Sequence, residues 1–136
     1  MFEYKATILR VVDGDTVDVD IDLGFDMWLK KQRIRLAGVD TPESRTRDKK
    51  EKECGLLAKK FVEENLMVGF KYTLKTKEKG KYGRYLGTFC CAHGDICELL
   101  ISNFHAVPYF GQSKKDIQLS HLENRKRLIE KGLLSK

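Results

Sequence analysis

Residues 17–23 alternate strictly between apolar and acidic side chains, and this alternation constrains the fold more than any other feature of the sequence. Successive side chains of a β-strand point to opposite faces, so a period of two separates the two kinds of residue. The apolar face consists of Val17, Val19, Ile21 and Leu23, and the opposite face of Asp18, Asp20 and Asp22. The segment is therefore predicted to be a half-buried strand with one face in water.

The segments on either side predict two partner strands. The apolar, β-branched run at residues 6–12 ends at Asp-Gly, which is the pattern of a strand that enters a tight turn. Residues 24–31 are typical of a hairpin connection, and residues 33–39 are predicted to return as a third strand. The first third of the chain is thus expected to form a three-stranded sheet.

The rest of the chain predicts three helices and two more strands. A charged loop at residues 44–53 precedes a first helix, which carries apolar residues at helical spacing and ends before Gly69. The remaining predicted elements are strands at residues 70–75 and 84–91 and helices at residues 96–104 and 116–131. Five strands with a helix between the third and the fourth are typical of an OB-type barrel. We therefore expect a mainly β, α+β fold, a five-stranded OB-fold barrel with three helices.

A single domain over residues 1–136 is the expected organisation, because this length supports one hydrophobic core and leaves too few residues for a second. Hydrophobic residues at 41% and charged residues at 34% indicate a globular chain. No apolar run is long enough to cross a membrane, so no membrane partner is expected. Residues 1–4 show neither a basic nor an apolar signal segment. We therefore expect a cytoplasmic location, or secretion if a signal peptide was removed.

Two short acidic turns follow apolar runs and are the strongest candidates for chemistry. The first is Asp-Gly-Asp-Thr at residues 13–16, and the second is Asp-Thr-Pro-Glu at residues 40–43. Carboxylates and carbonyls are hard oxygen ligands, which suit calcium or magnesium. Each turn alone also has a purely structural interpretation, since Asp-Gly is a common turn dipeptide.

Arg35 lies on the segment that joins the two acidic turns. Strand parity places it on the face that it shares with Ala37 and Val39, so its side chain is predicted to turn partly inward. An inward arginine needs an anionic partner, either a structural carboxylate or a ligand. Because a guanidinium matches phosphate oxygens, the two turns and Arg35 together suggest a metal-assisted phosphodiesterase.

Positive charge is concentrated between residues 71 and 84. The cations there are Lys71, Lys75, Lys77, Lys79, Lys81 and Arg84, against the single acid Glu78, in a chain of net charge +6. Such a segment concentrates positive potential where a polyanion can bind. A solvated surface loop has the same composition, so the charge alone leaves both interpretations open.

Three motifs occur in order along the chain. They are Val-Asp-Gly-Asp-Thr-Val at residues 12–17, Arg35 followed by Val-Asp-Thr-Pro-Glu at residues 39–43, and Lys-Tyr-Gly-Arg-Tyr-Leu at residues 81–86. Together with the elements between them, they resemble the staphylococcal nuclease (thermonuclease) family over nearly the whole chain. The resemblance implies a calcium-dependent endonuclease that hydrolyses DNA and RNA with low sequence specificity. It would break the bond to the 5′ oxygen and leave 3′-phosphates.

The resemblance also implies a role for each matched residue. Asp15 and Asp40 correspond to calcium-binding carboxylates, Thr41 to a residue that offers its backbone carbonyl, and Asp13 to a residue that orients ligands or bound water. Glu43 corresponds to the general base, or to a group that only orders the attacking water, and Arg35 and Arg84 correspond to the pair that grips the scissile phosphate.

The implied partners are DNA and RNA, preferably single-stranded, and we expect a monomer without an obligatory protein partner. Lys81 and Tyr82 resemble residues that hold the neighbouring phosphate, and Tyr109 resembles an aromatic platform under a base. A second tyrosine, expected two positions later, is replaced by Gly111, with Phe110 adjacent. Base stacking is therefore expected to be weaker or differently placed.

Two other function classes fit parts of the sequence. One is a catalytically inactive OB-fold module that binds nucleic acid or protein, and the other is a structural protein that calcium stabilises. Inactive modules of the family usually lose the acidic and arginine positions, all of which are present here. A nuclease is therefore the favoured interpretation.

Burial as a small apolar side chain is expected for at least one of the adjacent cysteines Cys90 and Cys91, rather than zinc binding. Adjacent side chains on a strand point to opposite faces, so Cys90 and Cys91 cannot easily share a zinc ion with His93. His105 and His121 lie outside the motifs, and no histidine-based catalysis is expected.

Overall fold

The computed structural model describes residues 2–79 and 84–134, which form eight strands and three helices. The strands are β1 (Phe2–Asp13), β2 (Thr16–Gly24), β3 (Met27–Leu36), β4 (Val39–Asp40), β5 (Lys71–Lys79), β6 (Tyr85–Cys91), β7 (Gly94–Asp95) and β8 (Val107–Pro108). The helices are α1 (Lys49–Asn65), α2 (Ile96–Ser102) and α3 (Lys114–Glu130). The five long strands and three helices follow the predicted order, and the three additional strands are two residues long.

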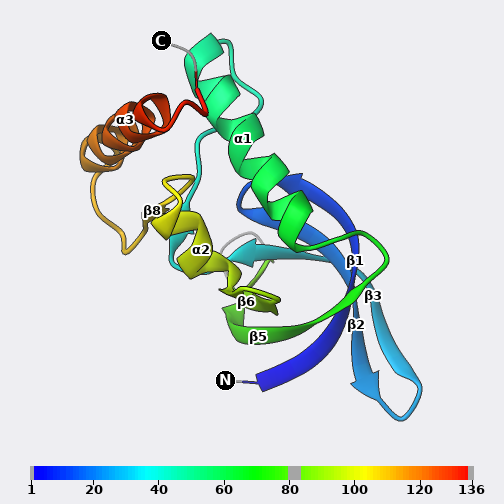
Figure 1. The fold of residues 1–136 in the computed structure, drawn as a ribbon. Coiled ribbons are helices and arrows are strands. Elements are labelled where there is room, and N and C mark those ends of the chain that lie inside the picture. The colour runs from blue at the N-terminus through cyan, green and yellow to red at the C-terminus, as the bar shows by residue number, and fades with distance from the viewer. Residues whose placement is uncertain (1, 80–83, 135–136) are drawn as a thin grey trace.

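Six strands form one sheet in the order β3-β2-β1-β5-β6-β7, and a further pairing joins β3 to β6. This pairing is parallel and sets Ile34 opposite Tyr85 and Arg35 opposite Leu86. The sheet therefore curls back on itself as an OB-type barrel, which confirms the predicted fold class. Figure 1 shows the three helices gathered on one side of the barrel, while the β2–β3 hairpin projects on the other side.

The apolar face of β2 points into the barrel, as its alternation predicts, except at Leu23 near the hairpin, which is 42% exposed. Val17 and Val19 are fully buried, and Ile21 is 4% exposed. Ile34 of β3 and Phe89 of β6 are also fully buried and belong to the same core cluster. These contacts fix the register of β2 and β3, and hence the positions of the residues at the ends of both strands.

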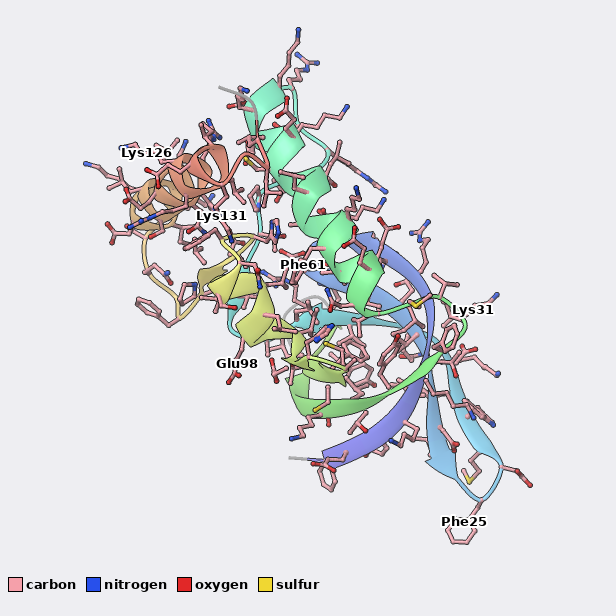
Figure 2. The ribbon with its side chains drawn as sticks, viewed as in Figure 1. Phe25, Lys31, Phe61, Glu98, Lys126 and Lys131 are labelled. Atoms are coloured by element: carbon pink, nitrogen blue, oxygen red, sulfur yellow. The ribbon has the colours of Figure 1, made fainter. Side chains whose placement is uncertain are left out.

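The hairpin between β2 and β3 is tighter than the sequence predicts. Residues 24–31 are predicted as a connection, but the turn consists of Phe25 and Asp26, and β3 begins at Met27. Both turn residues have positive φ, which is typical of two-residue hairpin turns. The prediction is wrong because the first half of β3 lies beyond the barrel and is largely exposed, so it lacks apolar alternation. Phe25 points away from the barrel at the hairpin tip (Figure 2).

Helix α1 begins inside the segment that is predicted as a charged loop. Asp48 caps the helix, because its side chain accepts hydrogen bonds from the backbone N–H groups of Lys50 and Glu51. Such a cap contributes about 1 kcal/mol. The first turn is charged and lies largely in water, so no apolar periodicity marks it in the sequence. The cap, rather than apolar spacing, marks where this helix begins.

Two thiols and one imidazole lie in the interior. The four cysteines are all within the described residues and form no disulfide; Cys54 and Cys97 are buried. The His105 ring lies 4.8 Å from the Phe61 ring, and burial lowers the pKa of His105 to about 4. This histidine is therefore neutral at neutral pH.

Among the described residues, no helix combines the length and apolar content that a membrane crossing requires.

Candidate active site

The two acidic turns meet at Gly14. A Cβ atom added to this residue would lie 2.8 Å from the Cβ atom of Ala58 on α1 and 3.0 Å from the Thr41 Oγ1 atom. The backbone N–H of Leu36 donates to the carbonyl of Asp15 at 2.8 Å, which ties the first turn to the end of β3. Helix α1, the first turn and the second turn therefore pack at one point, and only glycine fits between them.

Arg35 lies between the two acidic turns and contacts a carboxylate of each. Its Nη2 atom is 3.4 Å from the Asp15 Oδ2 atom and 3.6 Å from the Asp40 Oδ1 atom. Its Nη1 atom donates to the backbone carbonyls of Leu36 and Val39, both at 2.9 Å. With 19% of its side chain exposed, the guanidinium is held in one orientation by four contacts.

The predicted need of Arg35 for an anionic partner is confirmed, although the core lies on the opposite face of the strand. Ile34 and Leu36 point into the barrel and are at most 1% exposed. Arg35 therefore points out of the barrel and is half-buried by the two acidic turns instead. Both carboxylates remain partly open, since the side chains of Asp15 and Asp40 are 16% and 30% exposed.

Local hydrogen bonds hold the first turn. The Thr16 hydroxyl donates to Asp15 Oδ1 at 3.0 Å, and the Gly14 backbone N–H donates to Asp13 Oδ1 at 3.0 Å. Asp13 thus shapes the turn that presents Asp15. Thr41, the matched residue of the second turn, is 4% exposed.

Glu43 adds a third carboxyl group to the site. Although the residue as a whole is exposed, partial burial of its carboxyl group raises its pKa, and the charges of Asp13, Asp15 and Asp40 raise it further. The backbone of Glu43 is fixed by α1, because a Cβ atom on Gly55 would lie 2.5 Å from the Glu43 carbonyl carbon and oxygen. The site therefore concentrates negative charge beside one guanidinium.

His121 is a site residue that the sequence does not reveal. Its Nε2 atom lies 2.8 Å from the Asp40 Oδ2 atom, and 16% of its side chain is exposed. The contact leaves the other carboxylate oxygen, Oδ1, facing Arg35. No motif surrounds His121, and only the packing of α3 beside β4 brings it to Asp40.

The other matched residues lie at the edges of this group. Arg84 is half-buried and directly precedes β6, whose Leu86 pairs with Arg35. The backbone N–H of Tyr109 donates to the Gly38 carbonyl at 2.8 Å, and 46% of the tyrosine is exposed. Lys81 and Tyr82 lie outside the described residues.

Two hollows flank the carboxylates, and Tyr109 lines both. One, of about 370 Å³, is lined by Arg35, residues 36–39, Leu86, Tyr109 and Phe110. The other, of about 420 Å³, lies between the second acidic turn, α1 and α3. It is lined by residues 40–43, Asp48, Glu51, Cys54, Tyr109, Gln112, Lys114, Ile117, Gln118, His121, Leu122 and Arg125. Asp40 and Glu43 thus border the hollow between α1 and α3, and Arg35 borders the other hollow.

The fold is an OB-type barrel, and its candidate site holds Asp15 and Asp40 against the Arg35 guanidinium, with the Glu43 carboxyl group beside them. This fold and this group of charges agree with the family that the sequence motifs resemble. The sequence profile described as "Staphylococcal nuclease homologue" matches residues 33–136. The chain therefore belongs to the staphylococcal nuclease family.

Several relatives bear nuclease names. The chain is 32% identical over 116 residues to the Endonuclease YhcR of Bacillus subtilis, covering 79% of this chain and 9% of that protein. It is 37% identical over 87 residues to the Thermonuclease of Staphylococcus hyicus, covering 62% of this chain and 47% of that protein. It is 36% identical over 102 residues to the uncharacterized protein MJ1439 of Methanocaldococcus jannaschii, covering 61% and 46%. The chain thus spans less than half of each of these relatives. The two that bear nuclease names, together with the family match, support nuclease-type activity at the level of the family.

Proposed function

We propose that this chain is a calcium-dependent endonuclease that hydrolyses phosphodiester bonds of DNA and RNA. The observation that carries the proposal is the placement of Arg35, whose guanidinium lies within 3.6 Å of both Asp15 and Asp40. An arginine is well suited to phosphate oxygens, and hard carboxylate oxygens are suited to calcium. Both groups therefore lie where one phosphate and one cation can be held together.

The donor set fits a calcium ion. Within the described residues, no group of three or more His, Cys, Asp or Glu side chains is placed to hold a metal ion, so the protein would supply two carboxylates at most. Two aspartates, with the Thr41 backbone carbonyl and water completing the shell, agree with the preference of calcium for mixed oxygen ligands. The pKa of Glu43 is raised first by burial of its carboxyl group and then by the neighbouring carboxylates, whose negative charge a divalent cation would neutralise. Bound calcium would supply charge neutralisation and polarisation of a phosphate oxygen.

The side chains of this chain divide the remaining tasks. Arg35 and Arg84 bind the scissile phosphate and stabilise the charge that develops on its oxygens. Glu43 accepts a proton from the attacking water or orders that water, and either role requires hydrogen-bond contact with it. As the water oxygen bonds to phosphorus, the bond to the 5′ oxygen breaks. That oxygen takes up a proton from solvent and leaves as a 5′-hydroxyl, and the other fragment keeps a 3′-phosphate. Asp13 supports Asp15 through the first turn.

The substrate is proposed to be single-stranded, acted on by a monomer with little sequence preference. Tyr109 offers an exposed ring beside the apolar hollow, and an aromatic face accepts every base. Lys81 and Tyr82 are proposed to bind the phosphate next to the one that is cleaved. Gly111 leaves no second tyrosine, but Phe110 is 80% exposed and lines the same hollow.

Calcium removal tests the proposal directly. We expect the protein to cut single-stranded and plasmid DNA in calcium and to leave both intact in the presence of a chelator. End analysis of the fragments should show 3′-phosphates. Equal cleavage in both conditions would contradict calcium dependence, and tight DNA binding without any cleavage in calcium would favour the inactive-module interpretation.

His121→Leu is expected to weaken calcium binding by about 10-fold or more, because groups that orient a metal ligand typically contribute 10-fold to 100-fold in affinity. His121 Nε2 holds one oxygen of Asp40, and leucine offers no hydrogen bond. His121→Gln, which keeps a donor, should retain more of the affinity. Isothermal titration with calcium measures the effect without reference to activity.

Asn124→Ala is the matched control for His121→Leu. It removes another attachment of α3, the hydrogen bond from Asn124 Nδ2 to the Ala106 carbonyl, without touching Asp40. If Asn124→Ala weakens calcium binding as much as His121→Leu, the effect belongs to helix docking and not to the Asp40 contact.

A further inference from the structure

We propose that the hollow between α1 and α3 is a second nucleoside site, which takes the nucleoside that keeps the phosphate after cleavage. This inference rests on the proposed nuclease function and extends it to a part of the chain outside the motifs. At about 420 Å³ the hollow falls in the size range of small-molecule sites. It begins at Asp40 and Glu43, so an occupant would adjoin the reacting phosphate.

The α3 residues that line this hollow lie on one face of the helix. Its lining residues are Lys114, Ile117, Gln118, His121, Leu122 and Arg125, which recur every three or four positions. Among the residues of α3 only Leu128, in the last turns, is buried. The first three turns of α3 therefore present one face to the hollow, and this face does not pack against the barrel.

The two hollows border different residues of the proposed reaction centre. Glu43 borders the α3 hollow, while Arg35 and Leu86 border the other. In an in-line displacement the leaving oxygen departs opposite the attacking water. If Glu43 holds that water, the leaving nucleoside lies away from Glu43, in the hollow beside Arg35. An enzyme that cuts within a strand must accommodate a nucleotide on each side of the phosphate, and the retained nucleoside is therefore assigned to the α3 hollow, which borders Asp40 and Glu43.

The chemistry of the hollow selects a base and sugar over another phosphate. The carboxyl groups of Asp48, which caps α1, and Glu51 join those of Asp40 and Glu43 at this hollow, and the four acids outnumber the two cations that also line it, Lys114 and Arg125. The excess of negative charge disfavours a further phosphate. Ile117 and Leu122 supply an apolar wall, and Gln118 supplies an amide that can donate and accept hydrogen bonds. The Gln112 amide is bonded to the backbone of Pro108 and Phe110, so it shapes the wall between the hollows.

A pair of substrates and a pair of variants test the inference. Thymidylyl-(3′→5′)-thymidine has a nucleoside on both sides of the phosphate, whereas thymidine 5′-(methyl phosphate) lacks the retained one. The readout is the ratio of kcat/KM for the first substrate to that for the second, in calcium. We expect a ratio of about 10 or more for the unaltered protein, in line with the usual contribution of one bound base.

Leu122→Trp fills the hollow and is expected to bring the ratio close to one. Leu119→Trp is the matched control, since Leu119 is 56% exposed on the same helix and does not line the hollow; its ratio should stay high. Circular dichroism and thermal melting verify that both variants are folded. A ratio near one in the unaltered protein, or an unchanged ratio in Leu122→Trp, overturns the inference alone. If single-stranded DNA is cut in calcium but neither small substrate is, the inference fails alone; if single-stranded DNA is not cut either, the proposed function fails with it.

Discussion

Arg35→Ala is expected to lower kcat/KM on single-stranded DNA by a factor of about 100 to 1,000, the usual loss for one donor to a developing oxyanion. Four contacts hold the guanidinium in place before substrate arrives, so it loses little freedom on binding phosphate. Its removal also takes away the guanidinium that contacts both Asp15 and Asp40. Steady-state kinetics in saturating calcium measure the loss, and calcium titration separates it from weaker metal binding.

Arg33→Ala provides the control for this prediction. Arg33 lies two residues earlier on β3, on the same face of the strand, and pairs with Asp18 at 2.9 Å. That pair lies further along the sheet, away from the acidic turns, and 47% of the Arg33 side chain is exposed. The variant is expected to change kcat/KM by no more than about threefold, since exposed pairs contribute little. Similar losses in Arg33→Ala and Arg35→Ala would remove Arg35 from the proposed mechanism.

The fold was predictable wherever one face of an element packs against the core. The alternation in β2 gives its inward face correctly because Val17 and Val19 enter a closed barrel. The start of β3 and the first turn of α1 escape prediction for the opposite reason, since both lie largely in water. Apolar periodicity indicates which face of an element is buried, so it gives no signal where an element extends beyond the core.

The site was predictable to the extent that it is local in sequence. Asp15, Arg35 and Asp40 lie on turns or strand ends that short sequence motifs identify, and the structure brings their side chains together. His121 escapes prediction because 81 residues separate it from Asp40, and its contact depends on how α3 docks. The hollow on α3 escapes for the same reason, because its wall combines residues from α1, α3 and the second turn.

Gly55→Ala is expected to lower both stability and activity, although alanine is the better helix former by about 1 kcal/mol. A Cβ atom at this position would lie 2.5 Å from the carbonyl carbon and oxygen of Glu43 and 2.6 Å from the Ser44 nitrogen. These are backbone atoms, so α1 or the second acidic turn must move. Overpacking of this kind typically costs about 1 to 3 kcal/mol. A shift of Glu43 by about 1 Å can cost about 100-fold in kcat, because the attacking water must be held in line with the phosphate.

Thermal melting and kcat on single-stranded DNA, measured well below the melting temperature, separate the two effects of Gly55→Ala. Leu56→Ala is the matched control: the neighbouring side chain is 47% exposed, so its truncation leaves the contact with Glu43 intact. It should keep kcat close to that of the unaltered protein. A Gly55→Ala protein that is more stable and fully active would mean that the contact between α1 and the Glu43 backbone does not position the carboxyl group. A less stable protein with normal kcat would confine the role of Gly55 to folding, whereas loss of kcat in a folded protein would make α1 the support that holds Glu43 in place.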